Sequence, residues 1–420
     1  MSHVTISYGT KLSKRQARAA ASVWRRPDVR LALAALALAS FGLVMSVSAA
    51  GGAQFGQALT KRLVLTGLGV FAFLVGAGVD YHFWRRHHLA VLAIALVCLA
   101  AALFPPLSAA KNGARRWIDL GLPIGFQPSE FGKIALCIYL AAYCDRHVQH
   151  MGHFVHGFLA PLCVVGLVCG LILVEPDFGT AALTGLVCMV VLLVMGTRLV
   201  YVLLAALAAM PMLQELVFGV PYRMQRILAF LDPWKDARGS GYQLIQSLIA
   251  IGSGGIAGQG LGAGLQKEAF LPGATNDFVF SVVAEELGLI GSVVLIGLFA
   301  WLLWESLRVV LRSPDPFGFA LGLGLAVLLG TQAATHIAVA TACVPTKGLS
   351  LPFISAGGSS LIASMFAAGL LVGIARFRGQ PKPWQEEVPA YERLANRVFG
   401  RLRRACGNTI GPHLHGTEDD

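Results

Sequence analysis

Long apolar runs constrain this 420-residue chain more than any other feature. An apolar run of about 20 residues can cross a bilayer as a helix, in which every backbone polar group is paired internally. The sequence holds ten such runs, approximately at residues 31–50, 63–79, 89–104, 129–144, 155–174, 179–196, 199–218, 279–304, 317–341 and 355–375. Charged residues make up 13% of the chain, against about 25% in soluble domains. We therefore expect an all-α polytopic membrane protein with about ten transmembrane helices.

The basic residues are distributed as in a membrane protein rather than a nucleic-acid-binding one. The net charge is +11, but most cations lie in tails and in short loops between apolar runs. Residues 1–30 and 376–420 are expected to be cytoplasmic tails, because both are basic and an even number of spans places them on one side. Residues 31–375 then form one transmembrane domain, with a large outward loop at 219–278 between the seventh and eighth spans. The first run is too long for a signal peptide and is expected to be a retained anchor.

Outward loops should be poor in cations, but some of them are not. The loop before the fourth span contains Lys111, Arg115 and Arg116, which could bind phosphate groups or interact with lipid headgroups. Glu130 and Lys133 follow at the start of that span. They either neutralise each other or form a functional pair, since burying charge in a membrane is costly.

Two further outward loops carry cations. Arg223 and Arg226 open the long loop, whose later glycines could expose backbone amides to a phosphate or a sugar. No strand precedes these glycines, which argues against a dinucleotide fold. Lys347 is the one charge in Val344–Ser360, an irregular stretch that includes Ser355. A lysine at this depth needs an anion to offset its burial.

Acidic residues near the span boundaries are candidates for acid–base chemistry. Asp277 lies at the start of the eighth span, where it either caps the helix or takes part in a reaction. Glu175 and Asp177 flank a proline between two spans, where they could form a capped turn, bind a cation or order a pocket. Glu285 and Glu286 lie about 12 Å further along the helix than Asp277. They are too far away to be its partner, and we expect a buried polar network around them.

Several stretches resemble, in order and spacing, the SEDS family (shape, elongation, division and sporulation): Lys111–Lys133, Glu175–Thr180, Tyr222–Trp234, Leu271–Phe280 and Pro345–Ser360. The resemblance covers about residues 30–375. The Pro-Thr-Lys-Gly-Leu sequence at 345–349 is more similar to the division branch, FtsW, than to the elongation branch, RodA. The resemblance implies a peptidoglycan glycosyltransferase that polymerises lipid II, an undecaprenyl-pyrophosphate disaccharide peptide, into glycan strands during cell division. The transfer would invert the anomeric carbon and release undecaprenyl pyrophosphate.

The same resemblance implies roles for single residues. The family's essential aspartate falls on Asp277, which would act as base or positioner for the acceptor sugar's 4-hydroxyl. Partial burial would raise its pKa and strengthen it as a base. Outward cations would stabilise the leaving pyrophosphate without a general acid. The substrate-binding candidates are Lys111, Arg115, Arg116, Glu130, Lys133, Arg223, Arg226, Lys347 and Ser355. The sequence departs from the family where Gly273, Thr275, His336 and Ala356 stand in place of a common Glu, His, Asn and Tyr.

Partners and location are also implied by the resemblance. A class B penicillin-binding protein would supply transpeptidation, alongside other divisome proteins and membrane lipids, with no nucleic acid. The protein would be a multi-pass component of the cytoplasmic (inner) membrane at the division septum, with cytoplasmic termini and an extracytoplasmic active site. We see no metal-ligand set and expect no cofactor, although a divalent cation could accompany the pyrophosphate. Two alternatives stay open, a lipid II flippase and a non-catalytic divisome scaffold.

Overall fold

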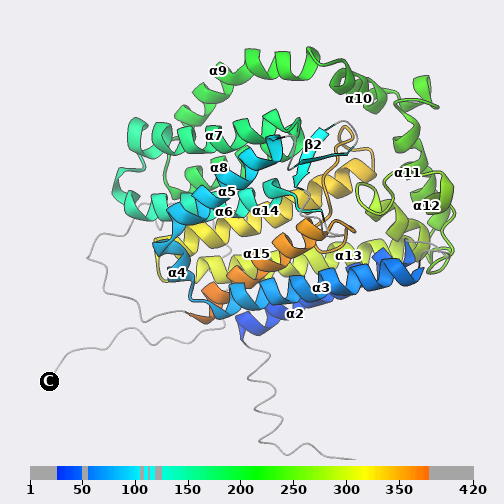
Figure 1. The fold of residues 1–420 in the computed structure, drawn as a ribbon, viewed down its shortest axis with the longest axis horizontal. Helices are drawn as coiled ribbons and strands as arrows, with labels where there is room; N and C mark the ends of the chain where they lie inside the picture. Colours follow the sequence, from blue (N-terminus) through cyan, green and yellow to red (C-terminus); the bar gives the residue numbers. More distant parts are fainter. Residues whose placement is uncertain (1–25, 50–54, 105–107, 112–113, 119–124, 378–420) are drawn as a thin grey trace, which may run out of the picture.

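The computed structural model describes residues 26–49, 55–104, 108–111, 114–118 and 125–377 as a helical bundle with one small β-hairpin (Figure 1). Most of both predicted tails, 1–25 and 378–420, lies outside the described residues. The long helices are α2 (Pro27–Ser48), α3 (Phe55–Gly78), α5 (His88–Leu103), α6 (Pro128–Arg146), α7 (Ala160–Val174), α8 (Phe178–Met195), α9 (Leu199–Phe218), α13 (Val279–Leu311), α14 (Pro316–Ala340) and α15 (Gly358–Arg376). The short elements are α4 (Tyr81–Arg86), β1 (Ser108–Lys111), β2 (Ala114–Ile118), η2 (Val148–His150), the π-helix η3 (Val155–Leu159), α10 (Pro221–Leu231), η4 (Pro233–Asp236), α11 (Tyr242–Gly254) and α12 (Gln266–Ala269).

Each predicted span corresponds to one described helix. Seven helical segments are long and apolar enough to cross a membrane: α2, α3, η3 with α7, α8, α13, α14 and α15. Two shorter apolar helical segments are α5 and the Leu199–Met212 part of α9, and α6 carries charged residues within its apolar sequence. Several predicted boundaries were off by a few residues, most at α3, which begins at Phe55 rather than 63, and at α13, which continues to Leu311 rather than 304. The chain is a multi-pass membrane protein.

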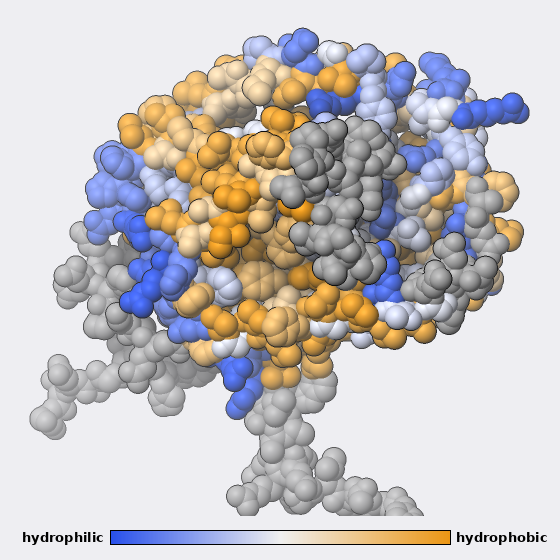
Figure 2. Space-filling view, viewed as in Figure 1, coloured by the Kyte–Doolittle hydropathy of each residue, from blue (hydrophilic) through white to orange (hydrophobic). Residues whose placement is uncertain are grey.

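The bundle has two polar ends and an apolar middle. Hydrophobic residues cover the centre of the face in Figure 2, and hydrophilic residues gather towards its left and right ends. One end carries α4, and the start of α2 and the end of α15 lie towards it (Figure 1). Ion pairs hold this end together, including Arg85 to Asp145 at 2.7 Å and Arg30 to Glu305 at 3.1 Å. The other end carries the hairpin, α10 to α12 and the connection between α14 and α15, and is called the site end below.

Glycines bring α3 and α15 into backbone contact. A Cβ at Gly369 would lie 2.3 Å from the Phe73 carbonyl oxygen, and a Cβ at Gly76 would lie 2.8 Å from the Leu370 nitrogen. Any side chain at either position would therefore force the helices apart. Small residues allow this close approach inside membranes, where van der Waals packing rather than the hydrophobic effect joins helices.

The site end is more ordered than the sequence indicated. The all-α prediction missed the antiparallel β1–β2 hairpin, and helices α10 to α12 occupy much of the predicted outward loop. Gly258, in the glycine-rich part of the predicted outward loop, packs against Gly288 of α13. Gly288 interrupts the helix with a φ of +65°, and a Cβ there would lie 2.4 Å from the Gly258 nitrogen. Gly258 and Gly288 therefore serve close backbone packing.

The expected network around Glu285 and Glu286 is confirmed. Glu285 accepts hydrogen bonds from the amides of Leu265 and Gln266, and Lys267 pairs with Glu286 at 2.5 Å. These contacts join α13 to the segment before Asp277.

Candidate active site

Asp277 lies between the predicted outward loop, residues 219–278, and α13, and it does not cap the helix. The N-cap of α13 is Phe278, without a side-chain hydrogen bond, so the capping alternative was wrong. The Asp277 amide instead donates to the Gly273 carbonyl at 2.9 Å. Gly273, with φ +76°, ends the turn in a conformation that favours glycine. A Cβ at Gly348 would lie 3.1 Å from Asp277 Oδ2, so the connection before α15 runs against the carboxylate.

The electrostatic surroundings of Asp277 suit a base. Burial raises the pKa of its carboxyl, while the positive charges of Arg226 and Arg116 lower it and the negative charge of Asp177 raises it. Burial outweighs the cations, so the pKa lies above the usual aspartate value. No hydrogen bond from a described residue to this carboxylate contributes to that balance. A desolvated carboxylate without donors is a stronger proton acceptor than a solvated one.

The two arginines whose charges act on Asp277 come from different elements, and carbonyl groups hold both of them. Arg116 of β2 donates from Nε to the Glu175 carbonyl at 3.0 Å and from a terminal nitrogen to the Pro176 carbonyl at 2.6 Å. Arg226 of α10 donates to the Thr346 carbonyl at 3.0 Å. Because carbonyls rather than carboxylates hold these guanidinium groups, their positive charge is available to an anion.

Phe178, the first residue of α8, gathers two further cations. Lys347 Nζ lies 5.1 Å from its ring centroid and the Arg223 guanidinium lies 5.3 Å away. Burial lowers the pKa of Lys347, and the charge of Asp177 partly restores it. Asp177 accepts from the Thr180 amide at 3.2 Å and caps α8, as one of the alternatives predicted. Four cations from β2, α10 and the α14–α15 connection therefore converge around one corner of α8.

The α14–α15 segment, residues 341–357, joins the turn before Asp277. Ser355 Oγ donates to the Asn276 carbonyl at 2.8 Å, and the Ala356 amide donates to the Thr275 carbonyl at 3.0 Å. Ser355 Oγ also accepts from the Leu351 amide at 2.8 Å. These contacts place Ser355 in a structural role within the site. At Thr275 and Ala356, two of the departures from the family pattern, the contact is made by backbone atoms.

A buried network holds the same segment from the bundle side. Lys133 Nζ lies 3.0 Å from Glu130 Oε1 and 3.1 Å from Gln332 Oε1, and the Gln332 amide donates to the Ser350 carbonyl at 2.9 Å. His336 Nδ1 lies one turn along α14 and pairs with the Leu349 carbonyl at 2.7 Å. The ion pair expected from the three-residue spacing is confirmed. The pair supports this segment, and its predicted contact with the substrate stays a prediction.

Glu175 is a second carboxyl at this end of the bundle. Its side chain is 0% exposed, and neither carboxyl oxygen has a hydrogen-bond partner among the described residues. Burial, reinforced by the charge of Asp177 and opposed by Arg116, raises the pKa of Glu175 to about 8. The residue is therefore mainly protonated at neutral pH. The following Pro176 has φ +32°, so the turn that presents its carbonyl to Arg116 is strained.

Arg62 of α3 is a polar residue of the site end that the sequence reasoning missed. It is 3% exposed and donates to the carbonyls of Phe353, Ile354 and Ser355. It directly precedes the predicted span at 63–79, and the residues around it form no motif that indicates a distant partner. The side chains of Lys111 and Arg115 lie outside the described part of the chain, so their predicted role stays a prediction.

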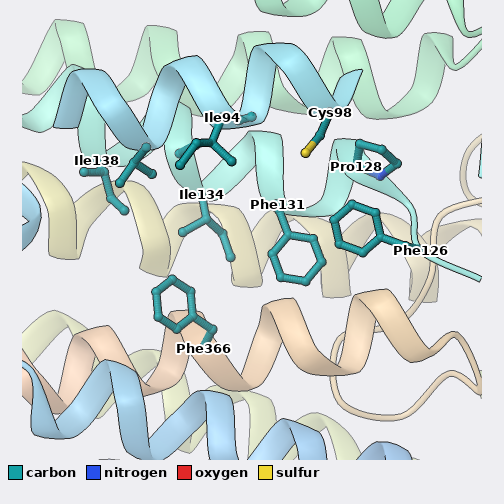
Figure 3. A pocket seen from close by; sticks show the side chains of 11 residues that line it. Ile94, Cys98, Phe126, Pro128, Phe131, Ile134, Ile138 and Phe366 are labelled. Atoms are coloured by element: carbon teal, nitrogen blue, oxygen red, sulfur yellow. The ribbon is translucent and has the colours of Figure 1, made fainter. Parts of the chain in front are cut away.

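An apolar cavity leads towards the hairpin. It has a volume of about 240 Å³ and lies between α5, α6 and α15, with Ile94, Cys98, Phe131 and Phe366 on its walls (Figure 3). Phe126 closes one end and pairs with Ile118 of β2 through two backbone hydrogen bonds of 2.8 and 3.3 Å. The strand that carries Arg116 is therefore attached directly to the wall of an apolar cavity.

Comparison with known proteins identifies the family. The family model for the cell cycle proteins FtsW, RodA and SpoVE matches residues 29–380. The chain belongs to this family. It is 43% identical to the "Probable peptidoglycan glycosyltransferase FtsW" of Geobacter sulfurreducens, over 85% of this chain and 97% of the relative. It is 35% identical to the stage V sporulation protein E of Bacillus subtilis, over 84% of this chain and 97% of that protein.

Solved structures of the family have the same fold. A chain from a peptidoglycan synthase complex, solved for the structural coordination of polymerization and crosslinking, superposes with a TM-score of 0.70 at 30% identity and covers 83% of this chain and 98% of its own. The rod shape determining protein RodA of Thermus thermophilus superposes with a TM-score of 0.62 at 28% identity and covers 83% of this chain and 97% of its own. The SEDS resemblance predicted from the motifs is confirmed.

Proposed function

We propose that this protein is a peptidoglycan glycosyltransferase that polymerises lipid II during cell division. The observation that carries the proposal is one desolvated carboxylate, Asp277, with the charges of Arg116 and Arg226 acting on it. An apolar cavity adjoins the strand that carries Arg116. A lipid-linked sugar diphosphate has three matching parts, namely an acceptor hydroxyl, a dianionic leaving group and an apolar tail. The names of the FtsW relatives support the same activity.

In the proposed reaction, Asp277 removes the proton from the acceptor sugar's 4-hydroxyl. The hydroxyl oxygen attacks the donor's anomeric carbon with inversion, while the bond to the diphosphate oxygen breaks and its electron pair leaves with undecaprenyl pyrophosphate. Arg116, Arg223, Arg226 and Lys347 stabilise the charge that develops on that group, so no acid is needed. The cavity lined by Phe126 and Phe131 would hold part of the isoprenoid tail.

Orientation follows from charge. The end of the bundle with α4 holds Arg30, Arg85 and Arg308 in ion pairs, which favours the cytoplasm under the positive-inside rule. The site end then faces outwards, where lipid II is polymerised, and both termini are cytoplasmic. We infer a class B penicillin-binding protein as partner, other divisome proteins around it and the division septum as location, supported by the peptidoglycan synthase complex among the structural relatives.

No organic cofactor is part of the proposal. Among the residues that the structure describes, no three His, Cys, Asp or Glu side chains are grouped to hold a metal ion. No step of the proposed reaction is assigned to a resident metal. A divalent cation that arrives with the pyrophosphate is tested by adding a chelator to the assay.

The decisive experiment measures glycan polymer made from purified lipid II by the protein with its cognate class B partner. Asp277→Asn keeps the shape of the side chain and should abolish polymer, whereas Asp232→Asn changes an exposed carboxylate of the same outward segment and should leave it unchanged. Equal activity in Asp277→Asn would contradict the role of Asp277. A wild-type complex that makes no polymer but moves lipid II across vesicles would favour the flippase, and one that does neither would favour the scaffold.

A further inference from the structure

Arg62 is a buried cation that the proposed reaction does not use. It is 3% exposed, and its hydrogen-bond partners among the described residues are carbonyl groups rather than carboxylates. Burying a guanidinium group is costly unless its donors are satisfied. The contacts of Arg62 must therefore supply a compensating gain.

Those contacts all go to one turn of the α14–α15 segment. One terminal nitrogen of Arg62 donates to the Ser355 carbonyl at 2.7 Å, and the other donates to the Phe353 and Ile354 carbonyls at 2.9 and 3.2 Å. Within the turn, the amides of Ile354 and Ser355 donate to the Leu351 carbonyl. Arg62 therefore caps the carbonyl groups of this turn. The planar fork of arginine can reach three carbonyls at once, which a lysine ammonium cannot match in geometry.

The turn is strained and enclosed, so it depends on an external donor. Phe353 has φ +65°, a conformation that a bulky residue holds only when its surroundings impose it. Gly42 of α2 packs against the same turn, since a Cβ there would lie 2.3 Å from the Phe353 carbonyl oxygen. Ser46 Oγ, also on α2, lies 3.1 Å from the Ile354 carbonyl. With α2 on one side, Arg62 is the principal donor to these carbonyls.

The end of this turn is bonded to the residues before Asp277. Ser355 Oγ donates to the Asn276 carbonyl and the Ala356 amide to the Thr275 carbonyl. We propose that Arg62 is a positioning residue for the transfer reaction, an inference that rests on the proposed function. It fixes the Phe353–Ser355 turn, the turn fixes Thr275 and Asn276, and their backbone sets where the Asp277 carboxylate meets the acceptor hydroxyl.

The test compares Arg62→Met and Arg62→Lys with Lys61→Met, which removes the exposed neighbouring cation and serves as the matched control. In Arg62→Met, amide hydrogen exchange at Ile354, Ser355 and Ala356 should quicken at least tenfold, with little change in α8. The kcat for polymerisation should fall about 10- to 100-fold, as small misplacements of catalytic groups do. Arg62→Lys should recover part of the exchange protection and part of the kcat, and Lys61→Met should match wild type in both measurements.

The pH profile separates positioning from loss of folded protein. Loosening the turn admits water to Asp277 and lowers its pKa, so the acid limb of kcat should move to lower pH. Fewer folded molecules would lower the rate without moving that limb. The proposal would be overturned if Arg62→Met left amide hydrogen exchange in the turn unchanged. It would also be overturned if Arg62→Met kept the wild-type kcat and the wild-type acid limb of the pH profile. If Arg62→Met folds poorly, Arg62→Lys provides the same readouts. An inactive wild type would count against the proposed function, while the exchange experiment would still decide whether Arg62 holds the turn.

Discussion

Replacing Glu130 with Gln should strongly destabilise the protein, because it leaves a buried ammonium without its anion. Lys133 is 2% exposed and Glu130 5%, and the two charges lie 3.0 Å apart in α6. Removing one partner of a buried pair costs about 3–5 kcal/mol, whereas an apolar replacement of both can be nearly neutral. Glu130→Gln with Lys133→Met should therefore recover most of the loss. The single variant should also weaken polymerisation, since Lys133 holds Gln332, which holds Ser350 of the α14–α15 segment.

The assay is thermal unfolding of the purified protein in detergent, followed by the fraction that stays monodisperse. The matched control is Asp232→Asn, which breaks a pair of the same spacing to Lys235, at 3.5 Å and with 42% and 82% of the side chains exposed. An exposed pair contributes about 0–1 kcal/mol, so its loss should barely move the midpoint. If Glu130→Gln were as mild as Asp232→Asn, or the double variant were worse than Glu130→Gln, the argument from burial would be refuted.

Further predictions concern pH, the cations, the cavity and helix packing. The pKa of Glu175 is raised to about 8 in the native protein, whereas the unfolded chain releases this proton above about pH 4.5. The free energy of unfolding should therefore fall as the pH rises from about 4.5 to about 8. Glu175→Gln should remove this pH dependence and be more stable than wild type by at most roughly 4 kcal/mol at pH 8, as measured in melting scans from pH 5 to 8.5. Arg116→Lys gives up the fork that holds the Glu175 and Pro176 carbonyls and should lower kcat/KM about 10- to 100-fold in the polymerisation assay; a wild-type value would remove Arg116 from the site. Ala95→Phe fills part of the cavity and should raise KM for lipid II more than for an analogue with a short tail; an equal effect on both would argue that the tail binds elsewhere. Gly369→Ala should destabilise by about 1–3 kcal/mol, because its Cβ would meet the Phe73 carbonyl at 2.3 Å, whereas Gly166→Ala on open α7 surface should be neutral or stabilising by thermal unfolding.

Features that are local in sequence could be predicted. Apolar runs of sufficient length predicted the spans, since each helix pairs its own backbone. Three-residue spacing predicted the Glu130 to Lys133 pair, and a carboxylate before a helix predicted the Asp177 cap. The position of Asp277 at the start of a span was also predicted. That Phe278 rather than Asp277 is the N-cap was not, because sequence does not locate a helix end to within one residue.

Features that depend on distant contacts could not be predicted. Arg62 meets carbonyls almost three hundred residues later in the chain, and nothing near Arg62 in the sequence signals that turn. The hairpin was missed because neither strand shows apolar alternation. Glu130 and Lys133 were expected to contact substrate, because pattern alone does not distinguish a ligand of the substrate from a support of the loop beside it. Each of these depends on which helices become neighbours.

The glycine contact between α3 and α15 makes the two helices one mechanical unit. No side chain separates their backbones at Gly76 and Gly369, so neither helix can slide or tilt without breaking the contact. Arg62 stands on the first helix, and the turn that it holds leads directly into the second. Arg62 on α3 and the start of α15, which hold that turn on its two sides, therefore move together. A growing glycan strand that pulls on the site end should therefore load α3 and α15 together, rather than one helix alone, before it disturbs the geometry at Asp277.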